Sequence, residues 1–80
     1  MTAKEAVAER IREICKERNM AINALANDAG VSPSTVYSML NNKSQNPGVV
    51  SLQKLCDSWK ITLRQFFDSP LFDDLEQAIK

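Results

Sequence analysis

Apolar side chains recur along the chain at intervals of three and four residues, which is typical of helices that bury one face. The first such stripe consists of Val7, Ile11, Ile14 and Cys15. It predicts a helix from about residue 3 to residue 18. The remaining faces carry opposite charges at helical spacing, most simply a solvated surface, at Glu9, Arg12, Glu13 and Lys16. No convincing alternation of period two predicts a strand, so the pattern favours an all-α fold.

Two short helices follow, with a tight connection between them. The apolar stripe of the first one is Ile22, Leu25, Ala26 and Ala29. Gly30 ends it, because glycine adopts the left-handed conformation of a helix C-terminus at low cost. Ser32 and Pro33 predict the next start: the hydroxyl caps a free amide, and proline takes the first position, where no donor is needed. This third helix runs to about Leu40 and buries Val36 and Met39.

Three further apolar stripes occupy the second half of the chain. After a polar loop over residues 41–48, a fourth helix buries Leu52, Leu55, Cys56 and Trp59. Thr62 and Gln65 form a capping-box pattern that opens a short fifth helix with Leu63, Phe66 and Phe67. Ser69 and Pro70 repeat the pattern of a helix start. The stripe that follows them, Leu71, Phe72, Leu75, Ala78 and Ile79, predicts a sixth helix at the C-terminus.

Composition excludes several classes of protein. A chain of 80 residues is one small domain, and no apolar run approaches the roughly 20 residues of a membrane span. Cys15 and Cys56 are far apart in a chain without histidine, which excludes the usual zinc sites and Ser-His or Cys-His catalysis. We therefore expect a cytoplasmic protein with reduced cysteines that is not an enzyme and has no metal, cofactor, membrane or small-molecule partner.

The formal net charge of zero conceals an uneven distribution. Residues 1–67 contain nine basic and six acidic side chains and carry +3, whereas residues 68–80 contain four acidic and one basic and carry −3. The body of the domain is therefore mildly basic and its C-terminal segment is acidic. A nucleic-acid partner stays possible, with modest affinity.

Two short helices joined at a glycine within an all-helical chain are typical of a helix-turn-helix. Residues 10–67 resemble the phage-repressor and Cro-like (XRE) family of helix-turn-helix domains. The matching stretches are Arg10-Ile11-Arg12-Glu13-Ile14, Leu25-Ala26, Ala29-Gly30-Val31-Ser32, Ser34-Thr35-Val36, Asn41, Lys43, Asn46-Pro47, Ile61-Thr62-Leu63 and Phe66-Phe67. Each stretch is short, and their order and spacing together carry the resemblance.

The resemblance implies a transcriptional regulator, a repressor in the first instance, that inserts its third helix into the major groove of double-stranded DNA. The positions that would face base edges are Pro33, Ser34, Tyr37 and Ser38. Those that would suit phosphate are Ser32 and Thr35 at the helix start and Asn41, Asn42 and Lys43 after its end. The fold it implies is a five-helix repressor-like domain over residues 1–67 with an additional C-terminal helix over residues 68–80.

Several positions depart from the family pattern. The base-facing positions hold no Arg, Lys, Asn or Gln, the usual base readers, and Ala21-Ile22 stands where the family has Ser-Gln. Cys15 and Leu40 occupy the positions of a buried Arg–Glu pair found in many relatives, so we expect these two side chains to touch across the core. An alternative interpretation is that Cys15 is a redox sensor. The neutral recognition face leaves an alternative function open: a protein-interaction module of the antitoxin or anti-repressor type.

The acidic C-terminal segment has two interpretations. As an amphipathic helix it would pair with a second copy and build a homodimer through Leu71, Phe72, Leu75 and Ile79. Alternatively it packs against its own domain.

Overall fold

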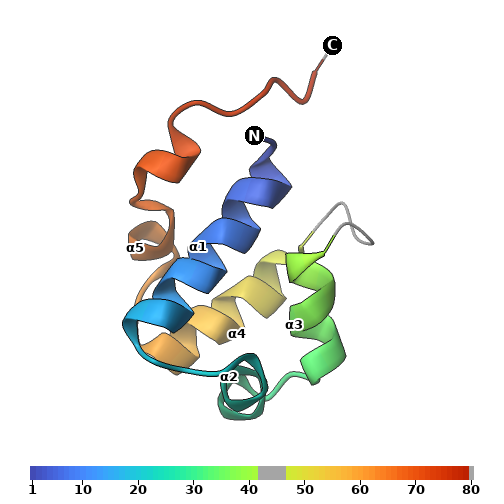
Figure 1. The fold of residues 1–80 in the computed structure, drawn as a ribbon, viewed down its shortest axis with the longest axis vertical. Helices are drawn as coiled ribbons and strands as arrows, with labels where there is room; N and C mark the ends of the chain where they lie inside the picture. Colours follow the sequence, from blue (N-terminus) through green and yellow to red (C-terminus); the bar gives the residue numbers. More distant parts are fainter. Residues whose placement is uncertain (42–46, 80) are drawn as a thin grey trace.

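The chain folds into a bundle of short helices (Figure 1). The computed structural model describes residues 1–41 and 47–79. In those ranges the helices are α1 (Ala3–Glu17), α2 (Ile22–Ala29), α3 (Pro33–Leu40), α4 (Val49–Trp59) and α5 (Leu63–Phe67), followed by one 3₁₀ turn, η1 (Pro70–Phe72). No strand occurs in this part of the chain, which confirms the all-α fold.

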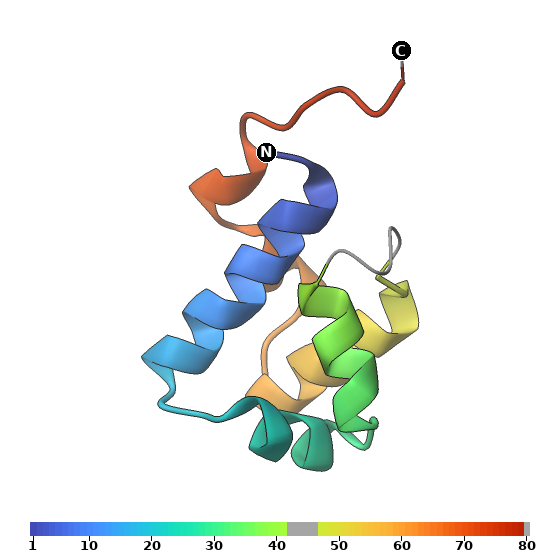
Figure 2. The same cartoon turned by 45° about the vertical axis from the view of Figure 1, so that its right-hand side comes forward.

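Helix α3 lies between two neighbours, α1 on one side and α2 on the other (Figures 1 and 2). Helix α2 also packs on α4, and α4 packs on α5. The 3₁₀ turn η1 returns to α1, so the chain closes around its first helix. This arrangement leaves one side of α3 at the surface.

One apolar core joins all five helices. Its completely buried large side chains come from each of them: Ile11, Leu25, Val36, Leu55, Trp59 and Phe66. The rings of Trp59 and Phe66 stack with centroids 6.2 Å apart. Among the described residues, no polar or charged residue is buried. Burial of these apolar surfaces is therefore the main source of stability.

Side-chain caps set most of the helix starts. Thr2 and Glu5 form a capping box at α1, and hydrogen bonds from Thr2 lower the pKa of the Glu5 carboxyl. The expected capping box of Thr62 and Gln65 opens α5. Gly30 ends α2 with φ at 72°, as its left-handed role predicts, and Lys60 ends α4 in the same conformation with φ at 60°.

The prediction of a C-terminal helix over residues 68–80 is wrong. Ser69 does cap a start, but the helical turn η1 ends at Phe72 and the described chain beyond it is irregular and runs past the N-terminus of α1 (Figure 1). A helix of this length is marginal in water unless its apolar face packs on something, and here the segment leads away from the domain. The backbone N–H of Glu76 instead donates to the carbonyl of Met1 at 3.1 Å.

The residues expected to dimerise consequently share no helical face. Phe72 packs on its own domain, with its ring centroid 4.9 Å from that of Phe67 and 6.1 Å from that of Phe66. Leu71 and Leu75 are half-buried, whereas Ile79 is 87% exposed. At Phe72 the C-terminal segment therefore packs against its own domain, which is the second of the two interpretations given above.

Phe72 should anchor the C-terminal segment, and its substitution tests this. Phe72→Ala should lower the free energy of unfolding by about 2 kcal/mol, because it removes apolar surface and two ring contacts. Ile79→Ala is the matched control in the same segment and should change that free energy by less than about 0.5 kcal/mol. Urea unfolding followed by tryptophan fluorescence measures both. Equal effects of the two substitutions would contradict the anchoring role.

Candidate nucleic-acid interface

Helix α3 has one buried side and one exposed side. Val36 is completely buried and Met39 is 3% exposed, as the sequence pattern predicts. On the opposite side Pro33, Ser34 and Tyr37 are exposed, and the side chain of Tyr37 is 48% exposed. Ser38, the fourth residue expected to face base edges, is half-buried. The structure thus brings these four residues onto one accessible helix at spacings of one turn.

Hydroxyl groups hold the first turn of α3 together. The Ser32 Oγ accepts a hydrogen bond from the Thr35 N–H at 3.3 Å, and lies 2.8 Å from Thr35 Oγ1 and 3.0 Å from Ser34 Oγ. One turn later the Ser38 hydroxyl donates to the Thr35 carbonyl at 2.9 Å. The polar groups of this helix therefore mostly bond to one another.

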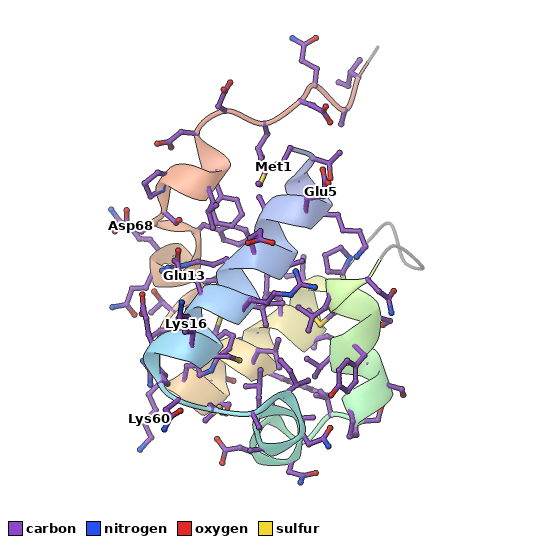
Figure 3. All side chains as sticks on the ribbon, viewed as in Figure 1. Met1, Glu5, Glu13, Lys16, Lys60 and Asp68 are labelled. Atoms are coloured by element: carbon purple, nitrogen blue, oxygen red, sulfur yellow. The ribbon has the colours of Figure 1, made fainter. Side chains whose placement is uncertain are left out.

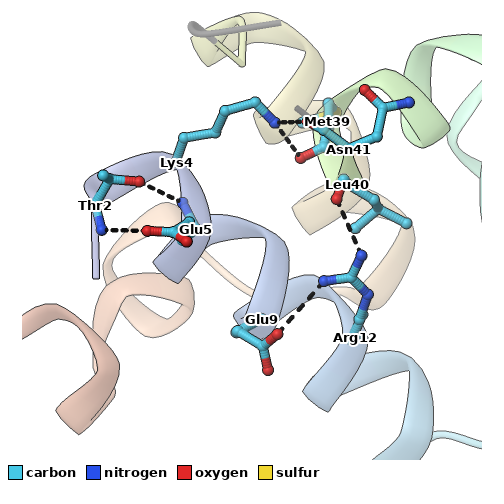
Figure 4. Close-up of polar contacts among 8 residues, drawn as sticks. All are labelled: Thr2, Lys4, Glu5, Glu9, Arg12, Met39, Leu40 and Asn41. Atoms are coloured by element: carbon cyan, nitrogen blue, oxygen red, sulfur yellow. Dashed lines mark hydrogen bonds and ion pairs between the residues drawn. The ribbon is translucent and has the colours of Figure 1, made fainter. Parts of the chain in front are cut away.

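Two cations of α1 bind the other end of α3 (Figure 4). The Lys4 ammonium donates to the carbonyls of Met39 at 3.2 Å, Ser38 at 3.4 Å and Asn41. The Arg12 guanidinium donates to the carbonyl of Leu40 at 3.0 Å. The last carbonyls of a helix lack partners within the helix and carry partial negative charge, so cations stabilise them.

Sequence reasoning missed this contact. It treated Arg12 as part of a solvated surface and gave Lys4 no role. The spacing places Lys4, Ala8 and Arg12 on one face of α1, and the structure leaves Ala8 only 5% exposed. The spacing alone indicates the shared face, and only the structure shows that this face meets the end of α3.

A third cation of α1 binds α5. The Arg10 guanidinium donates to the carbonyls of Phe66 at 2.7 Å and Gln65 at 3.1 Å. Glu13 pairs with Arg10, and Glu9 lies 3.5 Å from Arg12, so an acidic neighbour accompanies each arginine. Helix α1 therefore fixes the ends of two other helices.

The starts of α2 and α4 differ from the capped starts of α1, α3 and α5. Ala21 precedes α2 and Gly48 precedes α4, and neither offers a side chain that bonds to the first amides. Both helices pack together, and α2 packs on α3. Among the described residues, no side chain of the preceding residue caps the first N–H groups of these two helices.

The end of α3 leads into the loop expected to meet the DNA backbone. Asn41 is exposed, and its N–H donates to the Tyr37 carbonyl at 3.1 Å. Asn42 and Lys43, the other two residues expected at this position, lie outside the described residues.

The exposed side of α3 itself carries no charged side chain. Between residues 19 and 41 the sequence contains one charged residue, Asp28, and its carboxylate accepts a hydrogen bond from Ser58. The labelled charged residues Glu13, Lys16, Lys60 and Asp68 lie on the opposite side of the molecule from α3 (Figure 3). A ligand on the exposed side of α3 therefore meets uncharged side chains, with Lys4 and Arg12 at the C-terminal end of the helix.

Both cysteines lie in the apolar core. Cys15 and Cys56 are buried and unpaired, and burial raises the pKa of both thiols, with the Asp57 carboxylate adding to the rise at Cys56. A protonated, buried thiol is a poor sensor of oxidants. Leu40 packs against the same core cluster that contains Cys15, and direct contact between the two stays a prediction.

Within residues 1–41 and 47–79, no group of histidine, cysteine and acidic side chains could hold a metal ion. None of the helices in these ranges has the length and hydropathy to cross a bilayer.

Comparison with known proteins assigns the fold to a family. The sequence profile of the Cro/C1-type HTH DNA-binding domain matches residues 10–70. The chain belongs to this family. Its structure is also similar to the crystal structure of the prophage Lp1 protein 11, with a TM-score of 0.82 and 32% identity over 94% of this chain and 99% of that one. A search of curated protein sequences finds no match. The match confirms the resemblance to Cro/C1-type helix-turn-helix domains that the sequence indicated.

Substitution of Lys4 tests whether its hydrogen bonds stabilise the C-terminal end of α3. Lys4→Met keeps the aliphatic stem but removes the donors, and should lower the free energy of unfolding by about 1 kcal/mol. Lys16→Met, on the exposed face of the same helix, is the control and should change it by less than about 0.5 kcal/mol. In Lys4→Met, amide hydrogen exchange should quicken selectively at the end of α3. Uniformly faster exchange throughout the domain would contradict a local capping role.

Proposed function

We propose that this chain is a transcriptional regulator, acting as a repressor, that inserts α3 into the major groove of double-stranded DNA. The observation that carries the proposal is the exposed side of α3 in a Cro/C1-type helix-turn-helix domain, fixed at its start by Ser32 and at its end by Lys4 and Arg12. A helix held at both ends is suited to present side chains in a constant orientation to a rigid groove.

The proposal assigns contacts by position. Pro33, Ser34, Tyr37 and Ser38 face base edges, and Ser32 and Thr35 contact phosphate. The uncapped amides at the start of α2 serve as a further phosphate site, although Ala21-Ile22 lacks the Ser-Gln side chains that the family has there. Asn41, Asn42 and Lys43 follow α3 and meet the backbone of the same half-site.

We further propose that two copies act together on a two-fold symmetric site. A single neutral recognition helix supplies few charged contacts, so pairing of two half-sites is the simplest way to reach useful affinity. The likeness to a prophage protein supports an origin in a phage or another mobile element.

A salt titration of binding to random duplex DNA tests the function. Fluorescence anisotropy should detect binding at low salt that weakens as salt rises, because counterions are released from the phosphates. The slope of log K against log salt should be shallow, about −2 to −4, because the helix-turn-helix region has few cations. Sedimentation of the complex should give two copies for each duplex.

Absence of binding even at low salt would overturn the DNA proposal. It would favour the alternative, a protein-interaction module of the antitoxin or anti-repressor type. One observation supports that alternative: Val49 and Val50, at the start of α4, are 69% and 64% exposed. Adjacent exposed apolar side chains are typical of protein contacts when they belong to a larger apolar patch.

Ala21 offers a substitution whose effects on folding and on binding have opposite signs. Ala21→Asp caps α2 and should raise the free energy of unfolding by about 1 kcal/mol. The same carboxylate repels phosphate and should weaken duplex binding by about fivefold or more. Ala21→Ser is the control, because it caps α2 without adding charge. Unchanged duplex binding by Ala21→Asp would show that phosphate does not lie at this end of α2.

A further inference from the structure

The exposed side of α3 lacks the side chains that identify bases by paired hydrogen bonds. Between Pro33 and Leu40 the sequence has no Arg, Lys, Asn, Gln, Asp or Glu. Guanine is usually read by Arg or Lys, adenine by Asn or Gln, and cytosine by an acidic side chain. Helix α3 can therefore obtain little specificity from such pairs.

The hydroxyl groups of α3 add few donors. The single hydroxyl hydrogen of Ser38 points to the Thr35 carbonyl, so the outward part of this group is an acceptor. In the first turn the Ser32 hydroxyl lies 3.0 Å from that of Ser34 and 2.8 Å from that of Thr35. Each pair uses one hydroxyl hydrogen. Apart from the Tyr37 hydroxyl, the face consequently offers mainly weak acceptors.

The most extensive apolar surface on this face comes from Pro33 and Tyr37. They are four residues apart and lie one above the other on the helix. Pro33 is exposed, Tyr37 is 48% exposed, and the Tyr37 hydroxyl makes no hydrogen bond within the described residues. In the major groove the one apolar group on the base edges is the 5-methyl group of thymine.

We propose that α3 recognises its DNA through thymine methyl groups that pack against Tyr37 and Pro33, so that the preferred half-site is rich in A·T pairs. This inference rests on the proposed function. Ser34 and Ser38 fit the same site, because their oxygens can accept from the exocyclic amino group of the adenine paired with each thymine. Since the face carries no charge, the methyl contacts do not require an ion to lose its water.

Replacement of thymine by deoxyuridine removes only the methyl group and tests the proposal. A preferred duplex is first selected from a random library with the full chain. The same duplex is then synthesised with deoxyuridine at single positions in the half-site. Loss of each contacted methyl should weaken binding about fourfold, which corresponds to one buried methyl-sized group.

Two variants connect the methyl groups to Tyr37. At one or more positions of the half-site, Tyr37→Ala should bind the duplex with thymine and the duplex with deoxyuridine with equal affinity. The reason is that the side chain that contacts the methyl group has been removed. Tyr37→Phe keeps the ring and should retain the fourfold difference. Tyr37 lies outside the core, and circular dichroism checks that both variants are folded. Retention of the difference in Tyr37→Ala at every position would overturn the role of this residue.

The outcomes separate this inference from the function on which it rests. If no duplex is enriched and random DNA does not bind, the proposed function itself fails. If a duplex is selected but is rich in G·C pairs, or if deoxyuridine changes nothing, the function stands and thymine recognition is overturned.

Discussion

The positions of the helices depend on α1, whose cations satisfy the C-terminal carbonyls of two other helices. Lys4 and Arg12 donate to the end of α3, and Arg10 donates to the end of α5. Every helix ends in carbonyls without intrahelical partners, and in a short helix these make up a large share of the backbone. By binding these carbonyls, α1 holds the C-terminal ends of α3 and α5 in place.

These contacts complement an entirely apolar core. The family resemblance implies that Cys15 and Leu40 stand in place of a buried Arg–Glu pair, and among the described residues no charged residue is buried. Replacing both members of a buried ion pair with apolar groups is often neutral or stabilising, because neither charge then has to leave water. In addition to this shared apolar core, cations of α1 bind main-chain carbonyls at the end of α3, and these contacts need no buried charge.

The five helices could be predicted from the sequence because local signals and apolar spacing agree there. Gly30, Ser32-Pro33 and the Thr62–Gln65 pair each set a boundary that the structure confirms. The C-terminal segment shows the limit of such signals. Ser69-Pro70 and the stripe after it predict a helix, but a stripe does not show whether a surface is present to bury it, and helix formation depends on that surface.

The candidate site was only partly predictable for a similar reason. The exposed positions of α3 follow from the spacing of Val36 and Met39, which fixes the side that is buried. The roles of Lys4 and Arg12 depend on where the end of α3 comes to lie, a long-range feature that spacing along one helix cannot specify. The hydroxyl bonds of Ser32 and Ser38 likewise depend on rotamers that the sequence leaves open.

The central claim is that the neutral, doubly anchored side of α3 is the surface that binds DNA. The most direct measurement is NMR mapping of the ¹⁵N-labelled chain during addition of duplex DNA. The account predicts the largest amide shift changes in α3 and at the start of α2, with little change in α5 and η1. Large changes confined to α5, η1 and residues 73–79, with α3 unaffected, would contradict it.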